Sequence, residues 1–305
     1  GEEARLFCAS ALGAEPADDL VAVAERAEGW PVILRLLVLG MRSAPDQDDL
    51  LMRIPAIEGQ LEDFLVGEVF DRLPPHRQRA LLGTSILDRF CPALCKAVSG
   101  DGDLDEAGFL EWLVDSGLFV IPLDGVGEWF RYHHYFQELL QHRLRDRSGA
   151  DEIGLLHSKA SLWFERNGLP DEAVKHGARS HDPSLAVGMV RRHARDPGVV
   201  GNNGLVASWI RRLPRDLVEC TPSLVALSAW EQAALGQEPR VVELVGHLET
   251  LLAEPGQDPE ELRFGRIQFM ALRVCCCFAR RMVRCGKVPP SLVSTFSTAG
   301  PVRCW

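Results

Sequence analysis

The sequence predicts a mainly α-helical protein that contains one short β-hairpin. Three observations lead to this fold class. Apolar residues recur every three or four positions through much of the chain, which is the spacing of an amphipathic helix. Residues 118–132 instead are rich in β-forming residues around a glycine-containing turn. From about residue 150 the chain twice follows a plan of helix, turn and helix, which favours an α-solenoid of stacked helix pairs.

The first elements are expected to be helices with recognisable start and stop signals. Residues 16–28 form one of them, because Pro16 suits a first helical turn and Gly29 can end the helix. Pro31 can open the next helix, since a residue in the first turn loses no intrahelical hydrogen bond. Apolar residues at helical spacing then predict an amphipathic helix over residues 58–72.

The middle of the chain has the pattern of a winged-helix module. The "LPP" segment at 73–75 breaks the preceding helix and starts another. Short helices are expected around residues 76–83, 91–98 and 104–116. The segments "LFVIPL" and "EWFRY" then flank "DGVG" within residues 118–132, which predicts a β-hairpin. Small helices, a hairpin and a further helix, in this order, are the elements of a winged helix.

The remainder is expected to form degenerate tetratricopeptide-like repeats. Trp163 precedes the Gly-Leu-Pro turn of a first helix pair, and Gly168 is the glycine that begins this turn. Trp230 and Gly236 stand in the same order before the turn of a second pair. The two tryptophans are 67 positions apart, about two repeats of the roughly 34-residue helical-hairpin type. The concave side of such repeats commonly binds partners.

Composition and charge exclude several classes of function. The formal charge is −10 and the isoelectric point about 5.4, which argues against a general nucleic-acid-binding surface, because such a surface must be basic. No apolar run reaches the roughly 18 residues that a membrane-spanning helix needs. The N-terminus lacks the basic start and long apolar core of a signal peptide. We therefore expect a cytoplasmic protein that does not contact a membrane.

The nine cysteines are interpreted as reduced thiols. Their count is odd, their spacing is irregular and no C-x-x-C pair occurs. Cys91 and Cys95 stand four positions apart on an expected helix, where they could bind a metal in principle, but packing is favoured because matching ligands are missing. No metal site is predicted.

The C-terminal segment differs from the rest of the chain in charge. Residues 262–305 contain eight basic residues and no Asp or Glu, and helical periodicity is lost from the triple cysteine at 275–277 onward. One interpretation is a basic arm that binds phosphates. The other, which we favour, is a disordered end or a departure from the proper reading frame.

The motifs of common enzymes are absent. The sequence contains no phosphate-binding loop G-x-x-x-x-G-K-[ST], no G-x-G-x-x-G, no G-x-S-x-G elbow and no H-E-x-x-H. The "GTSIL" segment at 83–87 shares only a glycine and a serine with the elbow. We therefore expect no catalytic residues in this chain.

The adjacent residues His133 and His134 are the main candidates for chemistry, because they stand where the hairpin leads into a helix. As metal ligands they would point in different directions, and His142 is only a remote third ligand. As a catalytic base, either would need an oriented partner. Packing remains open. So does a phosphate contact, because a helix start favours an anion through its free N–H groups and its dipole.

Three segments together resemble a known family. They are "AERAEGWPVILRLLVLGM" (24–41), "LPPHRQRALLGTSILDRFCPALCKAVSG" (73–100) and "WFRYHHYFQELLQHRL" (129–144). Their order and spacing resemble those of the MalT-like, LuxR-type ATP-dependent transcriptional regulators, which belong to the STAND class of signal-transducing ATPases. The resemblance covers roughly residues 1–270.

The resemblance implies that this chain is a middle fragment. Such regulators carry a P-loop ATPase core, a small helical domain, a winged helix, a tetratricopeptide-like sensor and often a C-terminal helix-turn-helix. Residues 1–55 would be the helical lid region of the ATPase and residues 56–148 the winged-helix domain. Residues 149–272 would be sensor repeats, and residues 273–305 an atypical tail. The P-loop would lie before Gly1, and the DNA-binding domain after the end.

The resemblance also implies an ADP/ATP site, with Mg²⁺ in the parent protein. In the wider class a Gly-x-Pro segment lies against the adenine, and it is matched here by Gly29, Trp30 and Pro31. A Met-His-Asp motif places its histidine on the β-phosphate of bound ADP, and His133 occupies that place.

This motif departs from the wider class at both flanking positions. Tyr132 replaces the methionine and His134 replaces the aspartate, so His134 cannot supply a carboxylate.

The implied function is a transcriptional regulator that is off with ADP and on with ATP. Its partners would be the ATPase core of the same chain, an inducer or protein on the repeats, a second copy in the active state, and DNA only through a missing domain. Two alternatives remain: the same module in a kinase-linked regulator, and a helical-repeat scaffold for protein interactions.

Overall fold

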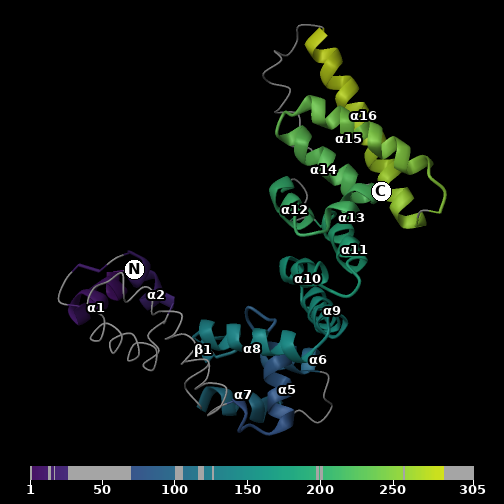
Figure 1. Ribbon diagram of the computed structural model, residues 1–305. Helices are drawn as coiled ribbons and strands as arrows, with labels where there is room; N and C mark the ends of the chain where they lie inside the picture. Colours follow the sequence, from purple (N-terminus) through teal and green to yellow (C-terminus); the bar gives the residue numbers. More distant parts are fainter. Residues whose placement is uncertain are drawn as a thin grey trace. The chain divides into compact units, whose positions relative to one another are not determined.

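The computed structural model is helical apart from one two-stranded sheet in the part of the chain that it describes, so the predicted fold class is confirmed. The described residues are 2–12, 15–16, 18–26, 70–99, 106–115, 120–125, 127–196, 199, 202–256 and 258–284. The chain divides into two compact units, residues 1–156 and residues 157–305 (Figure 1). The predicted domain boundaries stay predictions.

The first unit contains the hairpin and the short helices around it. Its elements are α1 (Glu2–Leu12), α2 (Asp18–Arg26), α5 (Pro75–Thr84), α6 (Pro92–Ser99), α7 (Glu106–Asp115), β1 (Val120–Pro122), β2 (Phe130–Tyr132) and α8 (His134–Arg147). The helices expected over 16–28 and around 76–83, 91–98 and 104–116 are confirmed. The helix expected to open at Pro31 lies outside the described residues, as does nearly all of the helix expected over 58–72.

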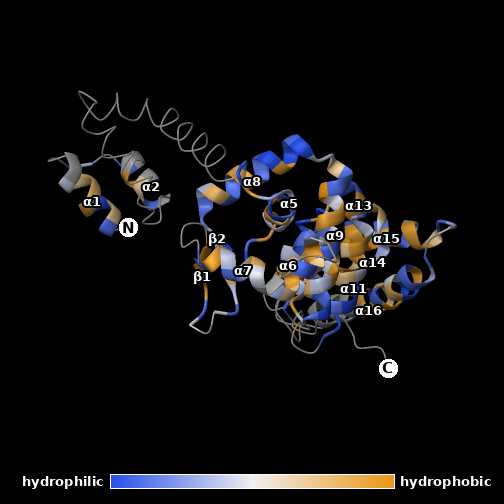
Figure 2. Cartoon of the chain, turned by 90° about the horizontal axis from the view of Figure 1, so that it is seen from below, coloured by the Kyte–Doolittle hydropathy of each residue, from blue (hydrophilic) through white to orange (hydrophobic). Residues whose placement is uncertain are grey.

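The second unit is built from helices, beginning inside α9. These helices are α9 (Ala150–Arg166), α10 (Pro170–Gly177), α11 (Ser184–His193), α12 (Asn203–Ile210), α13 (Arg215–Cys220), α14 (Pro222–Ala234), α15 (Glu238–Ala253) and α16 (Pro259–Arg284). In Figure 2 both hydrophobic and hydrophilic residues are visible on the helices of this unit, which is typical of amphipathic helices.

Two prolines set the start of α5. Pro74 is the N-cap residue, with φ −56° and ψ 146°, and Pro75 takes the first helical position. A proline there loses no intrahelical hydrogen bond and has its φ preset for the helix. The side-chain amide of Gln78 donates to the carbonyl oxygen of Leu73 at 2.9 Å, which ties the new helix to the turn before it.

The predicted hairpin is confirmed, and it is the two-stranded sheet. β1 and β2 pair antiparallel, with Val120 opposite Tyr132. The Asp124 carboxylate closes the turn, because its two oxygens accept the backbone N–H groups of Glu128 and Trp129, each at 2.9 Å. Gly127 supplies a φ of +72°, which residues with a Cβ rarely adopt.

A third backbone segment extends this sheet by one bridge. The N–H of Phe90 donates to the carbonyl oxygen of Phe130 at 2.8 Å, and the N–H of Phe130 returns the bond at 2.9 Å. The loop between α5 and α6 is thereby held against β2. The buried core of the winged helix lies around this bridge and comprises Leu81, Leu87, Phe90, Leu94, Val98, Leu113, Tyr132, Phe136 and Leu140.

The two predicted helix pairs of the second unit are confirmed. The first helix of each pair ends in the same type of C-cap. Gly168 between α9 and α10 has φ +71°, and Gly236 between α14 and α15 has φ +70°. The N–H after each glycine donates five residues back, from Leu169 to Phe164 at 3.0 Å and from Gln237 to Gln232 at 2.9 Å. This is the Schellman motif, which needs a glycine because of its left-handed backbone.

The helices α14, α15 and α16 lie side by side (Figure 1). Phe264, Gln268 and Leu272 form a buried stripe on α16 at four-residue spacing. The indole N–H of Trp230 on α14 donates to the side-chain oxygen of Gln268 at 2.8 Å, which satisfies both buried groups.

The backbone of α16 continues past residue 275 to Arg284, so the segment expected as an atypical tail, residues 273–305, starts in a helix; its further character stays a prediction. The earlier turns of this helix are anchored by the stripe on α14 and α15. Residues 285–305 lie outside the described residues.

Candidate functional site

His133 joins the hairpin to the next helix. It follows the last residue of β2 and is the N-cap residue of α8, with φ −59° and ψ 137°. Its carbonyl oxygen accepts the N–H of Gln137 at 2.9 Å, and only 4% of the residue is exposed. The N-terminal end of a helix of 14 residues favours an anion, because free N–H groups and the helix dipole point there.

The residue before it is fixed by packing. Tyr132 is fully buried, and its ring centroid lies 4.6 Å from that of Phe90 and 5.9 Å from that of Phe136. Its phenolic oxygen lies 2.6 Å from Oγ1 of Thr84 on α5. Burial raises the pKa of Tyr132 well above its ordinary value, so the hydroxyl stays neutral.

Hydrogen bonds tie α8 to the end of α5. The side-chain amide nitrogen Nε2 of Gln137 donates to the carbonyl oxygens of Ser85 at 3.0 Å and Leu87 at 2.8 Å. Gln141, one turn later, donates to Ser85 at 2.9 Å. The Ser85 hydroxyl donates to the Leu82 carbonyl oxygen at 2.7 Å. The "GTSIL" segment therefore has a structural role, because it holds α8 through Gln137 and Gln141, and its serine is fully buried.

The second histidine has a different environment. The side chain of His134 is 42% exposed, and its Nε2 lies 3.2 Å from a carboxylate oxygen of Glu138, one turn along α8. His142 is also exposed, and its Nδ1 lies 3.8 Å from Asp146. Within the described residues, no group of three or more His, Cys, Asp or Glu side chains is arranged to hold a metal ion.

Of the other residues predicted from the sequence, the structure describes only some. Gly29, Trp30 and Pro31, the expected adenine contacts, lie outside the described residues. Cys91 is half-buried and Cys95 is buried, and neither is in a disulfide. Burial raises the pKa of Cys91, which disfavours the thiolate that a metal would need.

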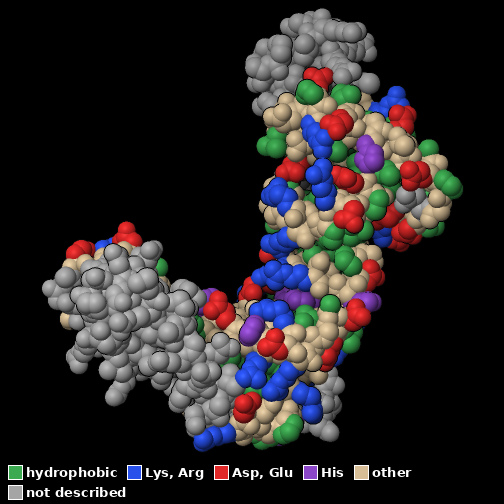
Figure 3. All heavy atoms as spheres, viewed as in Figure 1, with side chains coloured by type: hydrophobic (Ala, Val, Ile, Leu, Met, Phe, Trp, Pro, Cys, Tyr) green, Lys and Arg blue, Asp and Glu red, His purple; other side chains and the backbone are tan. Residues whose placement is uncertain are grey.

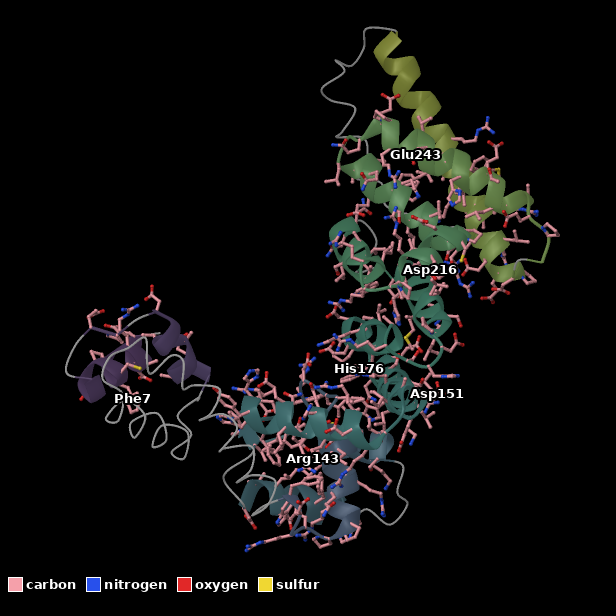
Figure 4. All side chains as sticks on the ribbon, viewed as in Figure 1. Phe7, Arg143, Asp151, His176, Asp216 and Glu243 are labelled. Atoms are coloured by element: carbon pink, nitrogen blue, oxygen red, sulfur yellow. The ribbon has the colours of Figure 1, made fainter. Side chains whose placement is uncertain are left out.

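A second pair of histidines, on two different helices, was not predicted from the sequence. His157 on α9 and His176 on α10 are both buried, and their Nδ1 atoms lie 2.9 Å apart. The ring of Phe164 stacks on that of His176 at 5.4 Å. A signal was present, because His157 falls on the same helical stripe as the buried Ala160 and Phe164. Figure 4 labels His176 on its helix.

Comparison with protein families assigns part of the first unit. Residues 66–152 match the family model described as the MalT winged helix domain, which covers the hairpin, His133 and α8. The chain carries a MalT-type winged-helix domain. The resemblance read from the segments around "GWP", "LPP" and "YHH" is therefore confirmed for the winged-helix part.

Curated relatives extend the similarity of this MalT-like chain beyond the winged helix. The serine/threonine-protein kinase PknK of Mycobacterium tuberculosis is 29% identical over 237 residues, which are 78% of this chain and 21% of the kinase. The HTH-type transcriptional regulator MalT of Vibrio campbellii is 33% identical over 208 residues, 67% of this chain and 22% of the regulator. MalT of Vibrio cholerae is 29% identical over 207 residues.

The chain spans about a fifth of the length of these relatives. What the comparisons show in common with these relatives is a MalT-like winged-helix module. Among the helices that the structure describes, none is both long enough and apolar enough to cross a membrane.

Proposed function

We propose that this chain is the middle part of a nucleotide-switched transcriptional regulator, in which the MalT-type winged helix senses the phosphates of a bound nucleotide through His133. The observation that carries the proposal is the position of His133. It is buried at the N-terminus of α8 and stands between a strand and a helix that are both fixed by hydrogen bonds. A rigid donor at a helix start suits the β-phosphate of ADP.

In this proposal ADP holds the regulator in its inactive state and ATP, with Mg²⁺, replaces it in the active state. The ATPase core of the same parent chain supplies most of the nucleotide site, including any slow ATPase activity. Gly29, Trp30 and Pro31 contact the adenine. An inducer or protein partner on the helical repeats shifts the balance, and it can do so only through different affinities for the two states.

The active parent would oligomerise, and a further domain would contact DNA. The winged helix itself has no such role in this proposal, in keeping with the acidic composition of the chain. On the face of the second unit visible in Figure 3, acidic and basic side chains are interspersed, which supports a protein-binding rather than a DNA-binding surface there.

The first test is to sequence the encoding DNA for about 1,000 bases on either side, a reach that follows from the roughly 100–200 residues of a typical domain. An in-frame P-loop upstream supports the proposal. A start codon directly before Gly1 without a P-loop would mean that His133 has no nucleotide to sense, and the chain would then be a helical scaffold.

The second test uses the parent protein with His133→Ala. Purified protein is denatured and the released nucleotide is quantified by chromatography. We expect His133→Ala to lose most of its bound ADP and to activate transcription without inducer. His134→Ala is the matched control, because His134 is half-exposed on the helix surface, and it should retain ADP. Full ADP retention in His133→Ala contradicts the assignment.

A kinase-linked regulator is the second candidate. The similarity to PknK covers more of this chain, 78%, than does the similarity to MalT of Vibrio campbellii, 67%. The same DNA sequencing separates the two candidates. A protein-kinase catalytic domain upstream supports the kinase-linked form, and a C-terminal helix-turn-helix without a kinase supports the regulator.

A further inference from the structure

The buried pair His157 and His176 stands apart from the winged helix and is not used by the proposed nucleotide switch. The two residues are 7% and 2% exposed, and their ring centroids lie 5.0 Å apart. The 2.9 Å between their Nδ1 atoms is a hydrogen-bond distance. One Nδ1 must therefore carry a proton and the other must present a lone pair.

This hydrogen bond tolerates one added proton but not two. In the neutral pair, one ring donates from Nδ1 and the other accepts. A first added proton on the distal nitrogen of the donor leaves the bond intact, although it places a charge in the interior. A second added proton must occupy the accepting Nδ1, which removes the bond and brings two cations to 2.9 Å. The two rings therefore titrate as one coupled system.

The immediate surroundings oppose the added charge. Burial lowers the pKa of His157 to about 4, and the nearby cations Arg179 and Lys175 contribute in the same direction. Glu172 is the acidic residue one helical turn before His176 on α10.

Two carboxylates on α9 and α10 form hydrogen bonds with residues of other helices. On α9, the Glu165 carboxylate accepts hydrogen bonds from Arg192 of α11, the shorter at 2.6 Å, and lies 3.7 Å from Nε2 of His193. On α10, Asp171 accepts the indole N–H of Trp209 of α12 at 3.0 Å.

Two further charged groups of the adjoining segments also have partners. Arg212, after α12, lies 3.1 Å from the Asp171 carboxylate. Arg191, on α11, lies 2.7 Å from the Glu261 carboxylate on α16. Arg191 and Arg192 on α11 and Arg212 after α12 are thus each paired with a carboxylate of another helix.

Close packing leaves little room for the rings to separate within the closed hairpin. The Ser161 hydroxyl on α9 donates to the Ala173 carbonyl oxygen on α10 at 2.7 Å. A Cβ added to Gly177 would lie only 3.0 Å from the Ser161 hydroxyl and from Ala186 on α11. Repulsion between the rings must therefore be relieved by moving α9 away from α10.

We propose that the His157–His176 pair is an acid-sensitive contact that keeps the α9–α10 hairpin closed at neutral pH and opens it locally when both imidazoles are protonated. The hairpin is the first helix pair of the second unit, so acid would change the surface that it offers to a partner. This inference does not depend on the proposed nucleotide switch.

The test is hydrogen–deuterium exchange of the 305-residue chain, followed by mass spectrometry and corrected for the intrinsic pH dependence of exchange. Because the pKa of His157 changes from 6.5 to about 4 on folding, linkage predicts that protection in α9 and α10 falls on the order of 50-fold from about pH 7.5 to about pH 4.5. Protection in α14 and α15 should change far less. Equal changes in both helix pairs would overturn the proposal.

The variant His157→Leu/His176→Leu removes both titrating groups and should abolish the acid-dependent loss of protection. His247→Gln is the matched control, because His247 is an exposed histidine of the same unit, and it should behave as the unmodified chain. If the double variant keeps the acid-dependent loss, the histidine pair is not its cause.

A measurement on the unmodified chain tests the proposal even if the double variant does not fold. In ¹⁵N NMR spectra of the imidazoles near neutral pH, one Nδ1 of the pair should be protonated and the other not. Acidification should protonate the second Nδ1 only together with the loss of α9–α10 protection. Protonation of both nitrogens while the hairpin stays protected would refute the mechanism.

Discussion

The phenolic oxygen of Tyr132 lies 2.6 Å from Oγ1 of Thr84, inside the winged helix. The Thr84 hydroxyl has a single proton, which it donates to the Ala80 carbonyl oxygen at 2.7 Å. Tyr132 is therefore the donor in the contact between the two side chains. The strand residue directly before His133 is thus fixed to α5, the first helix of the winged helix that the structure describes.

Replacing Tyr132 by Phe removes this donor and leaves the Thr84 hydroxyl with its backbone acceptor. We expect a destabilisation of about 1 kcal/mol, the usual value of one buried hydrogen bond. Hydrogen exchange of the α5 and α8 amides measures it. Thr84→Val should cost a similar amount, and the double variant should cost less than the sum, because both changes remove the same contact. Additive losses would contradict the pairing.

The link between α8 and the α5–α6 loop predicts unequal effects for two glutamines. Gln137→Ala removes two hydrogen bonds to carbonyl oxygens, whereas Gln141→Ala removes one. We expect the first variant to lower the free energy of unfolding by about 2 kcal/mol and the second by about 1 kcal/mol. Hydrogen exchange of the winged-helix amides at increasing urea concentrations measures both values. A larger loss in Gln141→Ala would argue against this geometry.

The turn geometry predicts opposite effects on stability for replacing a glycine in the α14–α15 turn and a glycine inside α15. Gly236→Ala should destabilise the α14–α15 pair by about 1 kcal/mol, because alanine is strained at a φ of +70°. Gly246→Ala, in the interior of α15 with open space around its Cβ, should stabilise the pair by about 0.5–1 kcal/mol. Thermal unfolding followed by circular dichroism distinguishes them. Shifts of the same sign in both variants would contradict the assignment of the cap.

The cysteines are expected to react in the order of their exposure. Cys220 is exposed at the end of α13, whereas burial raises the pKa of Cys91 and lowers its thiolate fraction. Alkylation with iodoacetamide near neutral pH should modify Cys220 on the order of tenfold faster than Cys91, as peptide mapping will show. In denaturant the two rates should converge. Rapid modification of Cys91 in the folded chain would argue against the packing interpretation.

Local signals predicted the elements well where one residue type determines the backbone. Pro75 marks the start of α5, Gly127 lies in the hairpin turn, and Gly168 and Gly236 end their helices. In each case a missing Cβ or a fixed φ acts within one turn of chain, so a single sequence carries the information. The position of His133 between strand and helix was predictable for the same reason.

Contacts between distant segments were not predictable in this way. The pairing of His157 with His176 depends on two helices meeting across a turn, and each histidine alone resembles an ordinary core residue. The packing of α16 likewise depends on helices distant in sequence, because its buried residues Phe264, Gln268 and Leu272 lie against α14 and α15.

The bridge between Phe90 and Phe130 has a consequence for folding kinetics. It joins residues about 40 positions apart, so its formation must close a long loop that contains α6, α7 and β1. The helix pairs of the second unit instead meet across turns of a few residues. Contacts between distant residues slow folding. During synthesis or refolding, the winged helix should therefore acquire its final structure after the helix pairs that follow it, although its sequence comes first.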